Sequence, residues 1–469
     1  MAMGRRRPAQ QGLWIDAGEI AKGPGHVFYR ALNEVLQRHG FDRFVEELIE
    51  KKKLFADGVG RPSVPPGVYF RMSLVGYFEG LGSERGVAWR CADSLGLREF
   101  LGYDVTQVPP DHSTLSRWRR KLPLSVHRKA FAWVVRVARE EGVLKGRQVA
   151  VDSTTLEANA AMKSIVRKAD GATYQQYLRK LAEAEGREQA TAAELQQMDR
   201  KRKKKVSNRQ WKSGTDPDAR IARMKDGRTR MAYKVETAVD LESGVTLAAE
   251  THAADRDDRK TVEATLQAAD ETAMNAGVAG GIEDAVMDKG YHSDAVVTGL
   301  EARGYRGFVS EPKVRGRRNW KRCQRRFGAE EAERRRRAVL ANRRRTRSAR
   351  GKALQRKRAE YPERAFALMK RSGGLGRVHV RGRREVSKKV QLHVAAANLG
   401  VVLRRLTGIG TPRSLQGRLA AALSALLVTV WGLIQLALRI RRDHDASASI
   451  SPPPGTLSAA PTEPLAASS

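Results

Sequence analysis

The sequence predicts a mixed α/β fold that follows an all-helical N-terminal region. Apolar residues recur at three- and four-residue intervals through residues 25–122, which is the periodicity of amphipathic helices. From residue 147 onward, short apolar runs alternate with helix-like segments, which is typical of a mixed sheet flanked by helices. With 469 residues the chain is longer than one typical domain, so we expect at least two modules.

The helical region begins with residues 25–52, which predict a helix pair broken near Gly40. A Pro-rich linker and a second helical set follow, and the set ends in PDHSTLSRWRRKL at 110–122. In this last helix Ser113 is the expected N-cap, and the apolar stripe consists of Leu115, Trp118 and Leu122. The rest of its circumference is basic, with Arg117, Arg119, Arg120 and Lys121. We interpret it as a DNA-contacting helix of helix-turn-helix type; the alternative is a solvated helix face.

The sheet is expected to start with strands at 147–152, 230–240 and 244–252. A helix at 257–277, a strand at 283–288, a helix at 294–304 and a strand at 305–311 follow. The first and fourth of these strands stop at an aspartate, Asp152 and Asp288. Rigid strand ends are where a metal site would place acidic ligands.

Basic segments dominate the remainder. Lys and Arg total 88 against 52 for Asp and Glu, a formal charge of +36, which points to a polyanionic partner. An insert at 156–229 carries Lys203, Lys204 and Lys205, and the Arg-rich segment 313–358 is expected to be solvated or disordered and to bind nucleic acid. Trp211 in the insert stacks on a DNA base in one interpretation and packs the insert in the other.

The acidic residues suggest phosphoryl transfer. Two Mg²⁺ ions held by carboxylates would suit that chemistry, and Mn²⁺ can substitute for Mg²⁺. Asp152, Asp288 and Glu363 are the candidate ligands, Glu363 beginning the helical segment 363–370. A strand-end Asp is also commonly a turn or helix-cap residue, which is the competing interpretation. Lys289, Tyr291 and His292 follow Asp288 as expected phosphate-facing donors, whereas Asp255, Asp257 and Asp258 are better explained as N-terminal caps.

Together these motifs resemble the bacterial insertion-sequence transposases of the DDE type. The likeness runs from about residue 25 to 420. In the N-terminal region it rests on RPSVPPGVYFRMSLVGYFEGL (61–81) and PDHSTLSRWRRKL (110–122). Further along it rests on VDSTTLEANAAMKSIVRK (151–168), DRKRKKK (199–205), DPDARIARMKDGRTRMAYK (216–234), VMDKGYHSD (286–294), PERAFALMK (362–370) and IGTPRSLQGRL (409–419). The resemblance implies an RNase H-like catalytic domain with the triad Asp152, Asp288 and Glu363, the aspartates on adjacent strands and the glutamate on a following helix.

One part of the family pattern is kept and another is not. The family's Tyr, Arg, Glu, Lys signature has six residues between Glu and Lys, and Glu363 and Lys370 keep that spacing. The position expected to be Arg is Ala359, so Arg358 beside it is the candidate for the phosphate contact. Glu360 competes as the third acid, but Glu363 is favoured because it alone has the lysine spacing.

The sequence thus predicts a DNA transposase that binds terminal inverted repeats, cleaves the element's ends and joins them to target DNA. The alternative is a non-catalytic, decayed or co-opted repressor that binds the same repeats. Expected partners are duplex DNA and further copies of the chain, in the cytoplasm with the nucleoid and without a membrane. The uncharged stretch 419–438 is interpreted as a buried or partner-facing helix, since arginines bracket both of its ends.

The expected organisation is therefore modular. A basic arm (1–24) precedes the helical DNA-binding domain (25–140) and the catalytic domain (145–400). A C-terminal helical segment (401–445) and a disordered tail (446–469) rich in Ser, Pro and Ala complete the chain.

Overall fold

The computed structural model describes Met3 and residues 26–55, 62–187, 189–202, 206–312 and 319–415. The chain divides into two compact units, Met1–Pro412 and Arg413–Ser469, and every helix and strand named below belongs to the first. Within the described ranges, no helix is long and apolar enough to span a bilayer. The stretch 419–438 and the tail 446–469 lie outside the described residues.

Seven helices come first in the described part of the chain. They are α1 (Val27–Arg38), α2 (Phe41–Glu50), α3 (Pro66–Phe78), α4 (Glu84–Asp93), α5 (Leu95–Leu101), α6 (His112–Lys121) and α7 (Leu124–Glu140). Gly40 separates α1 from α2 with a φ of 67°, a left-handed conformation that glycine adopts without a Cβ clash, so the predicted break is confirmed. Helix α3 is buried on nearly all sides, and its buried Arg71 donates to Asp42.

A six-stranded mixed sheet follows, with the order β4-β5-β1-β7-β8 and β6 also paired to β5. Its strands are β1 (Gln148–Glu157), β4 (Arg220–Arg223), β5 (Thr229–Asp240), β6 (Thr246–Ala253), β7 (Asp284–Met287) and β8 (Arg306–Val309). β1 runs antiparallel to β5 and parallel to β7. Five strands lie where the sequence predicts them, and β4 falls inside the insert, where none was expected.

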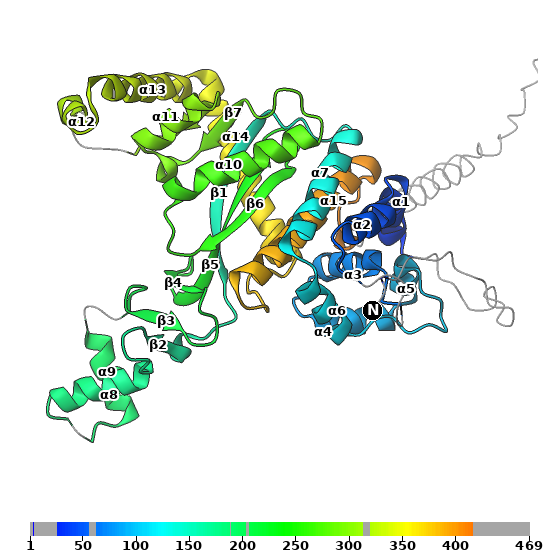
Figure 1. Cartoon of the computed structure of the whole chain (residues 1–469), viewed down its shortest axis with the longest axis horizontal. Coiled ribbons are helices and arrows are strands. Elements are labelled where there is room, and N and C mark those ends of the chain that lie inside the picture. The colour runs from blue at the N-terminus through cyan, green and yellow to red at the C-terminus, as the bar shows by residue number, and fades with distance from the viewer. Residues whose placement is uncertain are drawn as a thin grey trace, which may run out of the picture. The chain divides into compact units, whose positions relative to one another are not determined.

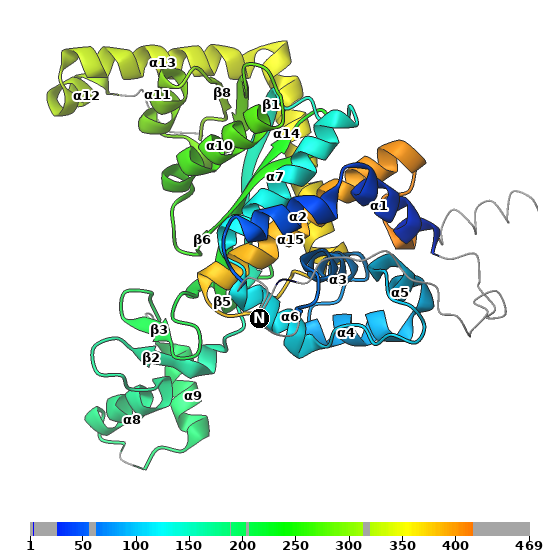
Figure 2. The same cartoon turned by 45° about the vertical axis from the view of Figure 1, so that its right-hand side comes forward.

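Two helices cover opposite faces of this sheet (Figures 1 and 2). Leu354 of α14 (Ala349–Ala367) joins Ala150 and Val286 in a buried cluster on one face. On the other face Thr261 of α10 (Asp258–Asn275) donates to Glu236 of β5. Helix α15 (Arg383–Thr407) packs against α7 and β6, so the N-terminal helices and the sheet share one compact unit.

Between β1 and β4 the insert forms a small substructure of its own. A 3-10 turn η1 (Met162–Ser164) precedes β2 (Ile165–Arg167), which pairs with β3 (Trp211–Ser213), and the helices α8 (Tyr174–Ala184) and α9 (Ala192–Lys201) lie between these two strands in the sequence. Both helices start at a threonine capping box, and Leu178, Ala182 and Leu195 form their buried cluster.

The expectation that the Arg-rich segment is unfolded is wrong. Its described part forms α12 (Trp320–Phe327), α13 (Ala329–Arg347) and the first part of α14. The elements not yet named are the 3-10 turn η2 (Lys289–Tyr291), the helix α11 (Asp294–Ala302) and the short π-helix η3 (Leu368–Ser372). Small and apolar residues such as Ala338 and Val339 are buried. Some arginines are compensated by groups distant in sequence, as where Arg345 binds Glu301 and the carbonyl of Gly307, and others by acids of the same helix, such as Arg335 by Glu331. Charge density therefore did not prevent folding.

Candidate active site

Asp152 and Asp288 lie side by side just beyond the last paired residues of β1 and β7. Asp288 directly follows β7, as predicted, but the expectation that the first strand ends at Asp152 is wrong, because pairing with β5 extends β1 to Glu157. The β1–β7 ladder pairs Ala150 with Val286, so the same register continued by two residues sets Asp152 level with Asp288. Adjacent strands are about 4.8 Å apart. Because residues two apart on a strand point to the same face, both carboxylates lie on the α14 face of the sheet.

The guanidinium of Arg358 lies between these two carboxylates. Its Nη2 is 2.8 Å from Asp152 Oδ2 and 3.5 Å from Asp288 Oδ2. The Arg358 side chain is 17% exposed, and the two aspartates are 21% and 39% exposed. One cation thus balances two acids at the edge of the core. Sequence reasoning proposed only a phosphate contact for this arginine.

Burial raises the pKa of Asp152 because it disfavours the charged carboxylate. The positive charge of Arg358 and the hydrogen bond from the backbone N–H of Ser153 oppose this rise, whereas the negative charge of Asp288 adds to it. Two acids in such proximity favour a cation between them. Their oxygens are also the ligands that Mg²⁺ and Mn²⁺ prefer, so the pair fits a divalent ion.

The third predicted acid is less closely placed. Glu363 lies on α14, five residues beyond Arg358, and its side chain is exposed. Its competitor Glu360 is also exposed and forms an ion pair with Arg364. In the part of the chain that the structure describes, no three His, Cys, Asp or Glu side chains are gathered closely enough to hold a metal ion.

Lys370 lies against the strand that carries Asp152. Its Nζ donates to Thr154 Oγ1 at 2.6 Å and to the carbonyl of Thr155 at 2.8 Å, which joins η3 to β1. Burial, followed by the positive charge of Lys225, lowers the pKa of Lys370 to about 8. The lysine therefore supports the site through β1 in this structure, a role that its sequence spacing did not reveal.

A buried polar network supports the opposite face of the same strands. Lys234 on β5 donates to Asp258 Oδ1 at 2.8 Å, and Ser153 Oγ donates to the same oxygen at 3.0 Å. Glu236, fully buried on β5, accepts hydrogen bonds from Thr261, Thr265 and Tyr291. Burial raises the pKa of Glu236, and these donors oppose the rise.

Two expectations near this network are corrected. Tyr291 does not face a phosphate: it is 1% exposed and its hydroxyl donates to Glu236 at 3.0 Å, because the η2 turn directs it into the core. Asp257 is the predicted cap of α10, but Asp258 instead binds Lys234 and Ser153. A signal was present in the sequence, since Lys234 and Glu236 lie between Ala232 and Ala238 on one face of the predicted strand, where a core would need apolar residues. Lys289 is exposed, as a phosphate contact would require.

Comparison with known protein families agrees with this geometry. Residues 144–399, more than half of the chain, match the Transposase DDE domain, and residues 18–121 match the Transposase domain (DUF772). The chain belongs to the DDE transposase family. Neither a curated protein nor a solved structure matches it. The match to the DDE domain spans β1 to α15 and includes all three candidate acids.

In the transposase's N-terminal helices, α6 differs from the prediction in two ways. Asp111 is its N-cap, accepting from the N–H of Thr114 at 2.8 Å, because the helix starts one residue before Ser113. Arg119 is not on an exposed basic face: it is 16% exposed and lies 2.6 Å from both Glu84 and Glu385. The predicted stripe is buried, comprising Leu115, Trp118 and Leu122.

The other three cations of α6 remain at the surface. Arg117, Arg120 and Lys121 are exposed, and Lys121 also lies 3.6 Å from the centre of the Phe55 ring. Their exposure leaves them available for phosphate contacts, which stay a prediction.

Trp211 packs the insert. It is 2% exposed, and Tyr174 and Tyr177 of α8 contact it edge-on at centroid distances of 5.1 and 5.2 Å. This burial contradicts the base-stacking interpretation. Lys203, Lys204 and Lys205 lie outside the described residues.

Proposed function

We propose that this transposase binds the terminal inverted repeats of an insertion sequence, cleaves the element's ends and joins the liberated 3′-hydroxyl to target DNA. The observation that supports this most directly is the pair Asp152 and Asp288, level on adjacent strands and facing one shared cation. We also propose that the domain is RNase H-like. The mixed sheet is consistent with that fold: β5 runs antiparallel to both β1 and β6, and β1, β7 and β8 run parallel to one another.

The chemistry proposed for the site is phosphoryl transfer without a covalent enzyme intermediate. Asp152, Asp288 and Glu363 would hold Mg²⁺ or Mn²⁺, which supplies charge stabilisation for the transferring phosphoryl group. Lys289, exposed next to Asp288, is placed to donate to a DNA phosphate. Water, and then the DNA hydroxyl, would be the nucleophile.

The test is strand cleavage by Asp288→Asn on duplexes carrying the element's ends, with Mg²⁺ and then Mn²⁺. The amide keeps the shape of the carboxylate but removes a charge from the proposed ligand set, so cleavage should be lost while DNA binding persists. Asp170→Asn is a matched control, because Asp170 is also 39% exposed and pairs with one arginine, Arg167. Undiminished cutting by Asp288→Asn, or equal losses in both variants at equal stability, would refute the assignment.

The non-catalytic repressor is kept as a second candidate for one reason. The described residues contain no group of three metal-binding side chains. Binding of the ends by the wild-type protein without cleavage in either metal would favour the repressor.

A further inference from the structure

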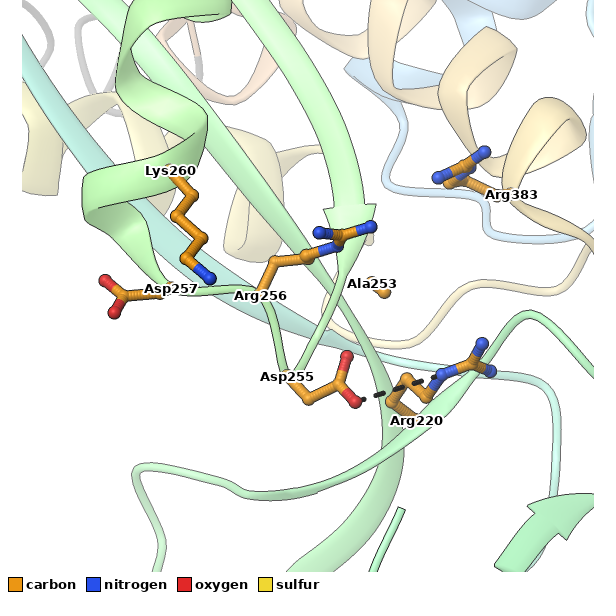
Figure 3. Close-up of a pocket in the computed structure, with 7 residues that line it drawn as sticks. All are labelled: Arg220, Ala253, Asp255, Arg256, Asp257, Lys260 and Arg383. Carbon is orange, nitrogen blue, oxygen red and sulfur yellow. Dashed lines mark ion pairs between the residues drawn. The ribbon is translucent and has the colours of Figure 1, made fainter. Parts of the chain in front are cut away.

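We propose that a basic pocket at the end of β6 binds a backbone phosphate of the DNA on which the transposase acts. This inference rests on the proposed function and adds a DNA-binding site to it. The pocket has a volume of about 440 Å³, and its charged lining comprises Arg220, Asp255, Arg256, Asp257, Lys260 and Arg383 (Figure 3).

The sheet topology explains why these side chains converge. β4 and β6 follow one another along the same edge of β5: Arg220 pairs with Ala232, and Ala253 pairs with Tyr233, the next residue. The start of β4 therefore lies beside the end of β6. The loop after β6 and the first turn of α10 bring Arg256 and Lys260, and α15 begins at Arg383 (Figure 3).

The cations of the pocket are only weakly compensated by the protein. Within the described residues the side chains of Arg256, Lys260 and Arg383 form no ion pair, and Arg220 reaches Asp255 only at 4.0 Å. The other acid, Asp257, is already paired with Arg259 at 2.5 Å. Four convergent cations with so little compensation favour a bound anion.

The positive charges of the pocket also affect the pKa of a neighbouring histidine, His252. The pKa of His252 is lowered to about 4, first by burial and then by the charges of Lys234, Arg383 and Arg256.

The pocket is connected directly to the strands of the active site. The carbonyl of Arg256 accepts from Lys234 Nζ at 2.9 Å, and that ammonium also binds Asp258. Asp258 in turn accepts from Ser153, the residue after Asp152. These contacts fix the pocket's loop to β1 and β5, so a phosphate bound in the pocket would be held at a set position relative to the strand that carries Asp152. DNA carries a phosphate at each nucleotide, which makes it the favoured ligand over a free phosphate ion.

The test compares the salt dependence of binding to a short DNA duplex. Arg256→Gln with Arg383→Gln removes two pocket charges while keeping polar, though shorter, side chains. If one phosphate contact is lost, the slope of log affinity against log salt should become shallower by about 0.9. Arg256→Lys with Arg383→Lys should keep the wild-type slope. The control is Arg136→Gln with Arg147→Gln, two surface arginines on α7 and before β1 with the same loss of charge, which should not change the slope comparably.

Each outcome separates the pocket from the proposed function. Equal slopes for the pocket variant and the control variant, with wild-type DNA binding intact, would overturn the pocket alone. Absence of DNA binding by the wild-type protein would overturn both. Inorganic phosphate gives a further measurement. Suppose that it raises the thermal unfolding midpoint of the wild-type protein but not of the pocket variant, while the pocket and control variants have equal salt slopes for DNA binding. The pocket would then bind small anions, and its assignment to DNA would be wrong. If the double variant unfolds at a lower temperature, Lys260→Gln, an exposed side chain, gives the same comparison with one charge.

Discussion

Arg358 provides the sharpest test of how the two aspartates are held. Its guanidinium is the cation that Asp152 and Asp288 share, so Arg358→Ala leaves two neighbouring acids without it. We expect the free energy of unfolding to fall and the affinity for Mg²⁺ to rise, because the guanidinium and the metal ion would compete for the same oxygens.

The magnitude follows from the geometry. A hydrogen bond between charged, mostly buried groups, such as the 2.8 Å contact with Asp152, contributes about 2 kcal/mol. The longer contact with Asp288, which is 39% exposed, adds less than about 1 kcal/mol. If Mg²⁺ must displace the contact of Arg358 with Asp152 in the wild-type protein, removal of the arginine should tighten metal binding by up to about 30-fold, since 1.4 kcal/mol is tenfold.

The assay is titration calorimetry with Mg²⁺, together with thermal unfolding with and without the metal. Arg356→Ala is the control, because Arg356 is exposed on the same helix and has no ion pair within the described residues. Metal affinity of Arg358→Ala equal to or weaker than that of wild type would refute the competition argument, whatever happens to stability.

Three further predictions concern residues whose place in the structure is specific. Trp211→Ala should destabilise the insert by about 3–5 kcal/mol, as expected for truncating a buried tryptophan, and reduce thermal stability and cleavage together; lost cleavage at unchanged stability would contradict its packing role. Arg119→Ala should lower the unfolding midpoint, since it leaves Glu84 and Glu385 without their shared cation, whereas Arg120→Ala should leave the midpoint unchanged; equal midpoints would be inconsistent with the buried pairing. Burial lowers the pKa of His127 from 6.5 to about 4, so the folded protein favours the neutral imidazole. The stability that this preference maintains is fully present above pH 6.5, and on the order of 3 kcal/mol is lost as the pH falls towards 4. Unfolding measured at several pH values should show this loss, and His127→Gln should reduce it.

The regular elements were predictable because their signals are local. Each of the expected strands and helices between residues 147 and 311 occurs within a few residues of its predicted bounds, apart from a longer β1. Asp152 lies within β1, because pairing with β5 extends that strand to Glu157, but the placement of Asp288 directly after its strand followed from the same local patterns. Their common level did not, because it depends on the register between two strands more than a hundred residues apart.

The failed predictions concern side chains whose partners are distant in sequence. A run of arginines predicts a solvated segment, because the sequence does not show that Glu301 and Glu311 lie beside α13. Arg119 belongs to a basic helix in the sequence, but its partner Glu385 comes from α15. Composition gives the number of charges, whereas only the fold decides which of them are already compensated.

Side chains along β1 point alternately to the two faces of the sheet, so neighbouring residues of this strand have different roles. Asp152 and Thr154 point to the α14 face and contact Arg358 and Lys370, whereas Ser153 points to the α10 face and binds Asp258. A one-residue slip of β1 would exchange these faces and place the carboxylate among the buried threonines of α10. Pairing with β5 on one side and β7 on the other excludes that slip, so the position of the candidate catalytic acid is fixed by the sheet as a whole.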